Sequence, residues 1–314
     1  MVLDYDRRTL IAGLLAAGFT AGCVGGNLGR HADRPGVAIT VDDFDLTGTA
    51  LLSAEDRDTA IRTALQRHRV KAAGFVAGKY VDDELAPRIL RRWSDDGHVI
   101  GNHSFSHRYF GGQNPDALMD DILKCEPLLS GYSGFRKFFR FPYLAEGRTS
   151  EERDAIRALL ARNGYRNAPV TIDTSDWYID NRLKARLHAK PDSSIDAYRR
   201  FYLDHLWDRA TFYDGLAKSL FGHSIDHTIL LHHRLTTGLF LDDALSMFKE
   251  RGWRLVDAEA AFDTPALRMQ PDTIPAGQSV IWAAAKADGR FNKLLRYPGE
   301  DGDYEAPRMD ALGL

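Results

Sequence analysis

Short apolar segments alternate with segments of helical pattern along most of the chain, and this alternation restricts the fold more than any other feature of the sequence. The first apolar segment, 37–41, is rich in β-branched residues, as buried strands are, and the connections between segments are short. This order is typical of βαβ units with parallel strands. The expected strands are 37–41, 72–76, 98–102, 138–141, 168–172, 228–231 and 254–256. They predict the α/β class, as a distorted, incomplete (β/α)7 barrel, with a doubly wound open sheet as the alternative.

The predicted barrel covers residues 36–265 and contains one long insertion. Between the fifth and sixth strands, residues 178–227 are too many for a simple loop, and they predict a helical cap. The apolar residues of the cap at helical spacing are Tyr198, Phe201, Tyr202, Leu206 and Trp207. Residues 266–314 hold Gly, Pro and charged residues with little periodicity, so we expect an irregular C-terminal extension.

Residues 1–23 have the pattern of an export signal peptide. Arg7-Arg8 precedes an apolar run at 10–19, and the small residues Ala21-Gly22-Cys23 follow. The run is too short for a stable membrane-spanning helix, and the paired arginines resemble a twin-arginine signal. Cys23 stands where a bacterial lipoprotein is cleaved and lipidated. We expect an exported protein, periplasmic or tethered to the membrane through Cys23, with 24–35 as a linker; an N-terminal amphipathic helix of a cytosolic protein is the alternative.

Charge and cysteine content exclude some functions. The chain has 41 basic and 44 acidic residues and a formal net charge of −3, without a cluster of Lys or Arg. Nucleic acid is therefore not an expected partner. The two cysteines, Cys23 and Cys125, cannot form a zinc site of the CxxC type or a disulfide framework.

Unusual polar residues follow the expected strands, at the point where each strand ends. They are Asp42 and Asp43, His103 and His107, Arg140, Asp173 and Asp176, and His232. Because parallel strands end at the same edge of a barrel, these side chains are expected to meet there, where the active sites of such folds are built.

His103 and His107 predict a metal site at this edge. Residues four apart face the same way if they lie on one helical turn. Two imidazoles and a carboxylate from another strand form a triad that leaves coordination positions open for water and substrate. A second pair with this spacing, His223 and His227, precedes its strand instead of following it, and we expect it at the surface.

Five short blocks, in order, resemble the polysaccharide deacetylase (NodB-homology) family, which is carbohydrate esterase family four. The blocks are Thr40 to Asp43, His103 to His107, Arg140 to Tyr143, Asp173 to Trp177, and Leu230 to His232. They correspond to the patterns Thr-x-Asp-Asp, His-Ser-x-Ser-His, Arg-x-Pro-Tyr, Asp-x-x-Asp-Trp and Leu-x-His. Together they span residues 37–233, and their shared order makes chance a poor explanation.

The resemblance implies a ligand set for a metal ion. Asp43, His103 and His107 would hold a divalent cation. Zinc is expected from the ligand types, and Co, Mn or Fe also fit them. The neighbouring Asp42 would remain free of the metal and accept a proton from the attacking water as general base, with Arg140 orienting it.

The resemblance also assigns the remaining site residues. His232 would protonate the departing amine, and Asp176 would hold its ring and raise its pKa. The backbone N–H of Tyr143 would stabilise the oxyanion. Trp177 and Leu230 would shape the pocket that receives the acetyl methyl group.

Several of these residues have alternative interpretations. Arg140 could pair with a surface acid, and Tyr143 and Trp177 could be core aromatics. Asp173 is expected to cap a strand end or turn. His233 could replace His232 as the acid, but one residue further along an extended segment it would point to the other face.

Two departures from the family pattern bear on substrate choice. Phe44 stands where a glycine is usual after the paired acids, and at the rim it would narrow the groove or contact substrate. His233 replaces a common acid. The helical cap should also overhang the site and restrict substrate length.

The resemblance implies an enzyme that hydrolyses carbon–nitrogen bonds other than peptide bonds. The expected function is metal-dependent removal of N-acetyl groups from glycans that contain N-acetylglucosamine, such as chitooligosaccharide, peptidoglycan or an exopolysaccharide. An O-acetyl esterase, or a hydrolase of a non-sugar amide, would use the same site. A catalytically inert carbohydrate-binding relative is the alternative from another class.

Overall fold

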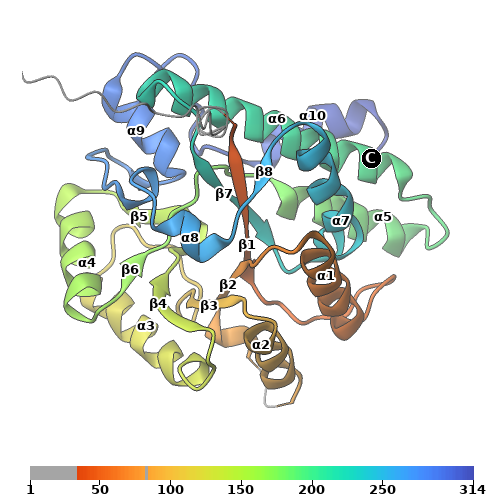
Figure 1. Cartoon of the computed structure of the whole chain (residues 1–314), viewed down its shortest axis with the longest axis horizontal. Coiled ribbons are helices and arrows are strands. Elements are labelled where there is room, and N and C mark those ends of the chain that lie inside the picture. The colour runs from red at the N-terminus through yellow and green to blue at the C-terminus, as the bar shows by residue number, and fades with distance from the viewer. Residues whose placement is uncertain (1–33, 82–83) are drawn as a thin grey trace, which may run out of the picture.

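A parallel sheet forms the centre of the molecule (Figure 1). The computed structural model describes residues 34–81 and 84–314. The sheet order is β6-β4-β3-β2-β1-β7, and β8 also pairs with β1. The strand bounds are Gly36–Asp43 (β1), Ala73–Val76 (β2), Val99–Asn102 (β3), Phe135–Phe139 (β4), Arg166–Asn167 (β6), Asp226–His232 (β7) and Arg254–Leu255 (β8). Each pairing in this sheet is parallel, so the predicted parallel sheet is confirmed.

The segment expected as the fifth strand closes the sheet into an incomplete barrel instead of forming one regular strand. At its start, Ala168 donates its N–H to Phe139 of β4, and a few residues later Ile172 bridges Ile229 of β7. The segment therefore crosses between the two edges of the sheet. Pro169 explains the interruption, because it has no N–H to donate to a strand ladder. The predicted barrel is confirmed, with this distortion.

Helices connect successive strands on the outside of the barrel. Their bounds are Ala54–His68 (α1), Leu85–Asp95 (α2), Pro115–Leu129 (α3), Ser150–Arg162 (α4), Leu235–Glu250 (α7) and Ala258–Phe262 (α8). Local sequence fixes several of their starts. Ser53 caps α1 by accepting a hydrogen bond from the Asp56 N–H, and Asn114 and Thr149 cap α3 and α4 in the same way.

The insertion before β7 consists of two helices, α5 (Asp176–Ala189) and α6 (Asp196–Phe221). Tyr198, Phe201 and Tyr202 of α6 are buried, as their helical spacing predicted. Figure 1 shows α6 running along the upper side of the barrel between α7 and α9. The insertion thus contributes to the core of the molecule.

The C-terminal extension contains regular elements that the sequence pattern did not predict. They are η3 (Ala266–Arg268), β9 (Ala276–Gly277), α9 (Val280–Asp288) and α10 (Gly302–Ala311). β9 pairs antiparallel with β5 (Ala145–Gly147), and Ile281, Trp282 and Met309 are buried in the main hydrophobic core. The expectation of an irregular extension is wrong here because these helices are held by tertiary packing.

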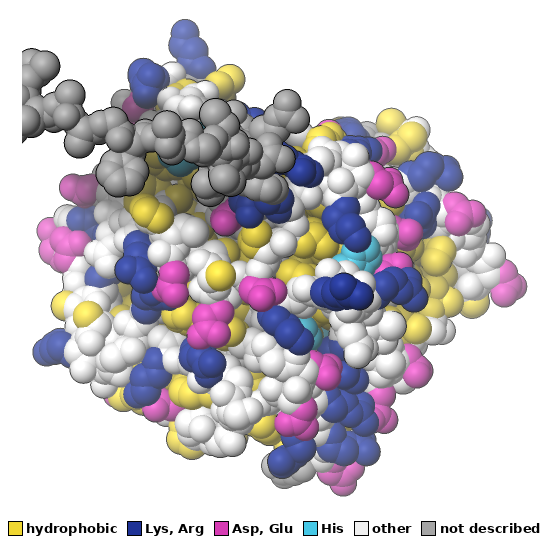
Figure 2. All heavy atoms as spheres, viewed as in Figure 1, with side chains coloured by type: hydrophobic (Ala, Val, Ile, Leu, Met, Phe, Trp, Pro, Cys, Tyr) yellow, Lys and Arg dark blue, Asp and Glu magenta, His cyan; other side chains and the backbone are white. Residues whose placement is uncertain are grey.

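The predicted signal peptide and Cys23 lie outside the described residues. Within the described part of the chain, no helix combines the length and the apolar character needed to cross a bilayer. Over the face drawn in Figure 2, Lys and Arg side chains are interspersed with Asp and Glu side chains, as expected from the nearly balanced composition.

Candidate active site

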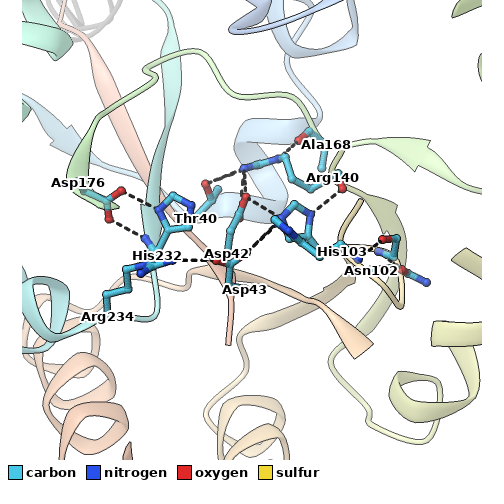
Figure 3. A network of polar contacts seen from close by, with 12 residues as sticks. Thr40, Asp42, Asp43, Asn102, His103, Arg140, Ala168, Asp176, His232 and Arg234 are labelled. Carbon is cyan, nitrogen blue, oxygen red and sulfur yellow. Dashed lines mark hydrogen bonds and ion pairs between the residues drawn. The ribbon is translucent and has the colours of Figure 1, made fainter. Parts of the chain in front are cut away.

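A pocket of about 570 Å³ lies at the carboxyl ends of β1, β3 and β7. Eight of the predicted site residues line it: Asp42, Asp43, His103, His107, Tyr143, Trp177, Leu230 and His232. The other two, Arg140 and Asp176, lie behind the pocket wall, where they contact Asp42 and His232. The structure therefore brings all ten predicted residues together at one edge of the barrel. Figure 3 labels Asp42, Asp43, His103, Arg140, Asp176 and His232 among them.

Asp43, His103 and His107 present three ligand atoms within 4.8 Å of one another. His107 Nε2 lies 3.1 Å and His103 Nε2 3.7 Å from Asp43 Oδ1. The other ring nitrogen of His103, Nδ1, lies 2.7 Å from the Arg140 carbonyl oxygen, which fixes the ring with Nε2 toward Asp43. Asp43 Oδ1 is buried and has no hydrogen bond of good geometry among the described residues.

The protonation states of this cluster suit a cation. Burial opposes ionisation of Asp43, but His107 and His232 hold the pKa of its carboxyl below the usual range. Burial and the neighbouring His107 lower the pKa of His103, which leaves a neutral imidazole. An ionised carboxylate and a neutral imidazole are the forms that bind metals. The unsatisfied Asp43 oxygen and this donor set therefore fit a divalent metal ion of the zinc type.

The two histidines do not lie on a helical turn, so that expectation is wrong. Residues 103–107 form a loop in which Ser104 (φ 61°) and His107 (φ 52°) have left-handed backbone conformations. The side chain of Asn102 accepts a hydrogen bond from the Ser104 N–H, and Ser104 Oγ accepts one from the His107 N–H. These local side-chain bonds replace helical ones and turn both imidazoles toward β1.

Asp42 is paired with Arg140 inside the barrel. Arg140 Nη1 lies 3.2 and 3.3 Å from the two carboxylate oxygens, and its Nε donates to the Ala168 carbonyl (Figure 3). Both side chains are buried, so the alternative of a surface ion pair is wrong. Burial raises the pKa of Asp42 to about 6, although Arg140 opposes this shift. Asp42 is thus a carboxylate held in one orientation beside the metal-ligand cluster.

His232 and Asp176 form a second oriented pair. His232 Nδ1 lies 2.7 Å from Asp176 Oδ1, and the His232 backbone N–H donates to Asp176 Oδ2 at 2.8 Å. Asp176 is the first residue of α5, so the helical insertion positions it. Burial lowers the pKa of His232, but the Asp176 carboxylate outweighs burial and raises it to about 9. His232 is therefore an imidazolium whose Nε2 is left for the pocket.

Tyr143 and Trp177 are not core aromatics. The Tyr143 side chain is 60% exposed, and its ring centroid lies 5.0 Å from that of His107. Trp177 is half-buried in the first turn of α5, and Leu230 is buried in β7. All three line the pocket.

Three expectations about neighbouring residues are corrected or refined. Phe44 does not reach the rim: it is buried, packs edge-on against Trp93 and stacks on His233. A left-handed backbone at Asp43 and Phe44 turns the ring into the core.

His233 faces away from the pocket, toward Arg57 and Asp58, as the strand alternation predicted. His227 is buried beside Asp214, and is not at the surface, because it lies inside β7.

Sequence reasoning missed two basic residues, Lys79 and Arg234, and one wall of the pocket. Arg234 Nη2 lies 3.5 Å from Asp43 Oδ2, and its position directly after His232 and His233 was the available signal. The expected overhang by the helical cap is also wrong, since Trp177 is the sole pocket-lining residue from α5 and α6. Gln278, Tyr297, Pro298, Glu300 and Asp301 of the C-terminal extension line the pocket instead.

The incomplete parallel barrel, with a pocket at the carboxyl ends of its strands, places this protein in the (β/α) barrel class. Residues 29–168 match the sequence model of the polysaccharide deacetylase family. A peptidoglycan-N-acetylglucosamine deacetylase of Bacillus cereus is 27% identical over 73% of this chain and 68% of its own length. A chitooligosaccharide deacetylase of Azorhizobium caulinodans is 30% identical over 43% of this chain and 64% of its own length. These similarities confirm the resemblance to the polysaccharide deacetylase family that the five sequence blocks predicted.

Solved structures agree with this assignment. A peptidoglycan N-acetylglucosamine deacetylase in complex with a substituted N-oxidanyl-benzamide has a TM-score of 0.50 and 25% identity, covering 73% of this chain and 88% of that chain. A pseudoenzyme of carbohydrate esterase family four from Bacillus anthracis shares the fold, with a TM-score of 0.51 and 19% identity over 74% of this chain and 67% of that chain. The enzyme class predicted from the sequence, hydrolases of carbon–nitrogen bonds outside peptides, is the class of the named deacetylases.

Proposed function

We propose that this protein is a metal-dependent deacetylase that removes N-acetyl groups from glycans containing N-acetylglucosamine. The observation that carries the proposal is the buried, unsatisfied Asp43 Oδ1 between His103 and His107, with an oriented carboxylate and an oriented imidazolium at the same pocket. The named activities of the Bacillus and Azorhizobium relatives support this substrate class.

Asp43, His103 and His107 would hold the metal. Zinc is the first choice for two imidazoles and one carboxylate, and Co, Mn or Fe suit the same ligands. When bound, the ion polarises the acetyl carbonyl and lowers the pKa of a water molecule. Arg234, next to Asp43, adds a positive charge that keeps this carboxyl ionised.

Asp42 and His232 would move the protons. The oxygen of the attacking water bonds to the acetyl carbonyl carbon, and Asp42 takes one of its protons. The C–N bond then breaks while His232 Nε2 gives its proton to the departing nitrogen. Return of the proton from Asp42 to His232 through solvent restores both groups, so one water is consumed for each acetate and amine released.

The remaining residues would orient the reactants. Arg140 holds Asp42 in one rotamer, and Asp176 fixes the His232 ring with Nε2 toward the pocket. The Tyr143 N–H would donate to the oxyanion, and Trp177 with Leu230 would enclose the acetyl methyl group.

Acetate release tests this proposal. The full chain is loaded with zinc and assayed on acetylated chitooligosaccharides, peptidoglycan fragments and an O-acetylated xylan, before and after treatment with a chelator. We expect acetate from the N-acetylated glycans, loss of activity with the metal and recovery on adding zinc back. Release from the xylan alone would favour an esterase, and metal-independent release would contradict the site assignment.

Export through residues 1–23 and lipidation of Cys23 complete the proposal, because a glycan of the cell envelope lies outside the cytoplasm. Mass spectrometry of the mature N-terminus, from protein produced in bacterial cells, would detect cleavage before Cys23 and an attached lipid. An intact Met1 in the mature protein would contradict both.

A further inference from the structure

One wall of the pocket is built from a part of the chain that has no catalytic role in the proposal above. Residues 297–301 of the C-terminal extension lie far beyond residue 168, where the match to the family ends, yet Tyr297, Pro298, Glu300 and Asp301 line the same pocket as His103 and His232.

This wall is firmly attached to the body of the protein. Glu300 is buried and accepts hydrogen bonds from Arg209 of α6 at 2.9 Å and from Arg296 at 3.1 Å. The indole N–H of Trp282 in α9 donates to the Arg296 carbonyl at 2.7 Å. Charged hydrogen bonds inside a buried network hold a segment in one place. Through Arg209 of α6, the helical insertion therefore also anchors the wall.

Tyr297 gives the wall an aromatic surface. Its side chain is 54% exposed, and its ring packs against buried Trp282 with centroids 5.9 Å apart. Tyr109 and Tyr143 continue this surface along the rim, with ring centroids 6.1 Å apart. Exposed aromatic rings that are held rigidly at a pocket suit the apolar face of a sugar ring.

Asp173, which lines the same pocket as the wall, adds a hydrogen-bonding group. The carboxyl is buried and lines the pocket, and its Oδ1 accepts the Thr174 N–H at 2.9 Å. Among the described residues no Lys or Arg forms an ion pair with it, and burial together with Glu300 raises its pKa well above the usual value. A buried carboxyl without a cationic partner is stabilised by any ligand that exchanges hydrogen bonds with it.

We propose that residues 297–301 close one end of the pocket, so that it takes the terminal sugar of a short acetylated glycan. Tyr297 stacks on the ring of that sugar, and Asp173 exchanges hydrogen bonds with its hydroxyl groups. The pocket volume of about 570 Å³ lies in the range of sites for small ligands. This inference rests on the proposed deacetylase function and adds to it a preference for chain ends over internal units.

The position of the removed acetyl group tests the inference. Zinc-loaded full-length protein is incubated with acetylated chitooligosaccharides from the disaccharide to the hexasaccharide, and the products are sequenced by mass spectrometry. We expect one free amine, at a chain end, for every length, and a kcat/KM that stops rising after the trisaccharide. Internal free amines, or a kcat/KM that grows with each added unit, would overturn the inference.

Two variants of the wall should change KM more than kcat. Tyr297→Ala and Asp173→Ala should each raise KM for the disaccharide by about tenfold, as expected for a lost stacking contact and a lost hydrogen-bonding carboxyl. Tyr297→Phe should restore the KM. The control variants on the C-terminal extension are Leu294→Ala and Asp303→Ala, which replace exposed residues away from the pocket. An unchanged KM in Tyr297→Ala would contradict the stacking role.

Direct binding separates this inference from the proposed function. If the wild type released no acetate from any glycan, the deacetylase proposal would fail, and calorimetric titration with the chitodisaccharide would still test the wall. Binding that is about tenfold weaker in Tyr297→Ala than in wild type and Leu294→Ala supports the inference. No binding to wild type, or equal affinity in all three proteins, overturns it.

Discussion

Two clusters among the described residues bring histidine and carboxylate side chains close enough together to hold a metal ion, and they differ in which protein groups already contact their ligand atoms. In Asp43–His103–His107 and in His205–Glu300–Glu305, the ligand atoms all lie within 4.8 Å of one another. Both clusters are largely buried. Spacing and residue type alone therefore do not distinguish them.

The second cluster is satisfied by protein groups. His205 Nε2 accepts the Ser175 N–H at 2.9 Å, and its Nδ1 lies 3.4 Å from Glu305. Glu300 is paired with Arg209 and Arg296. A metal ion there would have to displace two arginines. In the first cluster, Asp43 lines the pocket, and its Oδ1 has no hydrogen bond of good geometry among the described residues, with its nearest cluster partner, His107 Nε2, 3.1 Å away. The comparison teaches that free ligand atoms, more than ligand spacing, indicate a metal site.

The largest expected effect comes from removing one carboxylate from each cluster. Asp43→Asn should lose bound metal and all measurable turnover, because the amide supplies no negative charge to the cation. Glu305→Gln should keep both, since its cluster holds no metal in our assignment. Elemental analysis of the purified proteins, together with acetate release, checks this. If folded Glu305→Gln protein lost its bound metal, the assignment of the metal to the Asp43 cluster would be contradicted.

Beside the first cluster, the role of Asp42 as general base can be distinguished from the role of the metal ligands. Asp42→Asn should retain metal but lose turnover by about 10²- to 10⁴-fold, the usual contribution of a general base. Steady-state kinetics and metal analysis on the same sample measure both quantities. Asp45→Asn is the matched control, three residues further along and outside the pocket that holds His232. Turnover within a few-fold of wild type in Asp42→Asn would rule out the base assignment.

The second cluster should matter for stability. Arg209→Met removes one partner of buried Glu300 and should lower the free energy of unfolding by about 3 kcal/mol, the lower end for broken buried pairs, because Arg296 remains. Arg308→Met breaks an exposed pair with Asp208 and should cost less than about 1 kcal/mol. Chemical denaturation of the two variants gives the difference. Equal free energies of unfolding in Arg209→Met and Arg308→Met would show that the ion pair with Arg209 does not stabilise buried Glu300.

The smallest expected effect is a shift in the pH dependence of kcat in Asp176→Asn. The charged groups acting on His232 are Asp176, Asp42, Asp43, Asp173 and Arg234. His232 has a raised pKa, so it is protonated and able to donate below about pH 9, and this ability is lost as the pH rises through that value. Asp176→Asn removes the main charge that raises this pKa. The alkaline limb of the kcat profile should therefore move to lower pH, and an unmoved limb would argue against His232 as the acid.

Local pattern was sufficient to predict the strands and most of the site. Short apolar runs located β1, β2, β3 and β7, and the rule that parallel strands end at one edge placed Asp42, His103 and His232 together. The choice of His232 over His233 followed from the two-residue period of a strand.

Other features depended on interactions that are distant in sequence. Pro169 interrupts the expected fifth strand, and hydrogen bonds to two different strands decide its path. The insertion of α5 and α6 was expected to cover the site, but it contributes Trp177 and Asp176 and anchors the extension through Arg209. The extension looked irregular because its helices are short and are stabilised by packing against the core.

The sequence by itself determined which residues can perform the chemistry, because residue type sets charge, ligand preference and proton affinity, and strand periodicity sets which face each side chain takes. Only the tertiary structure decided which of two similar clusters has free ligand atoms and which distant segment closes the pocket. Those properties arise from burial and from electrostatic interactions between residues such as Asp173 and Glu300, more than a hundred positions apart, which no local pattern records.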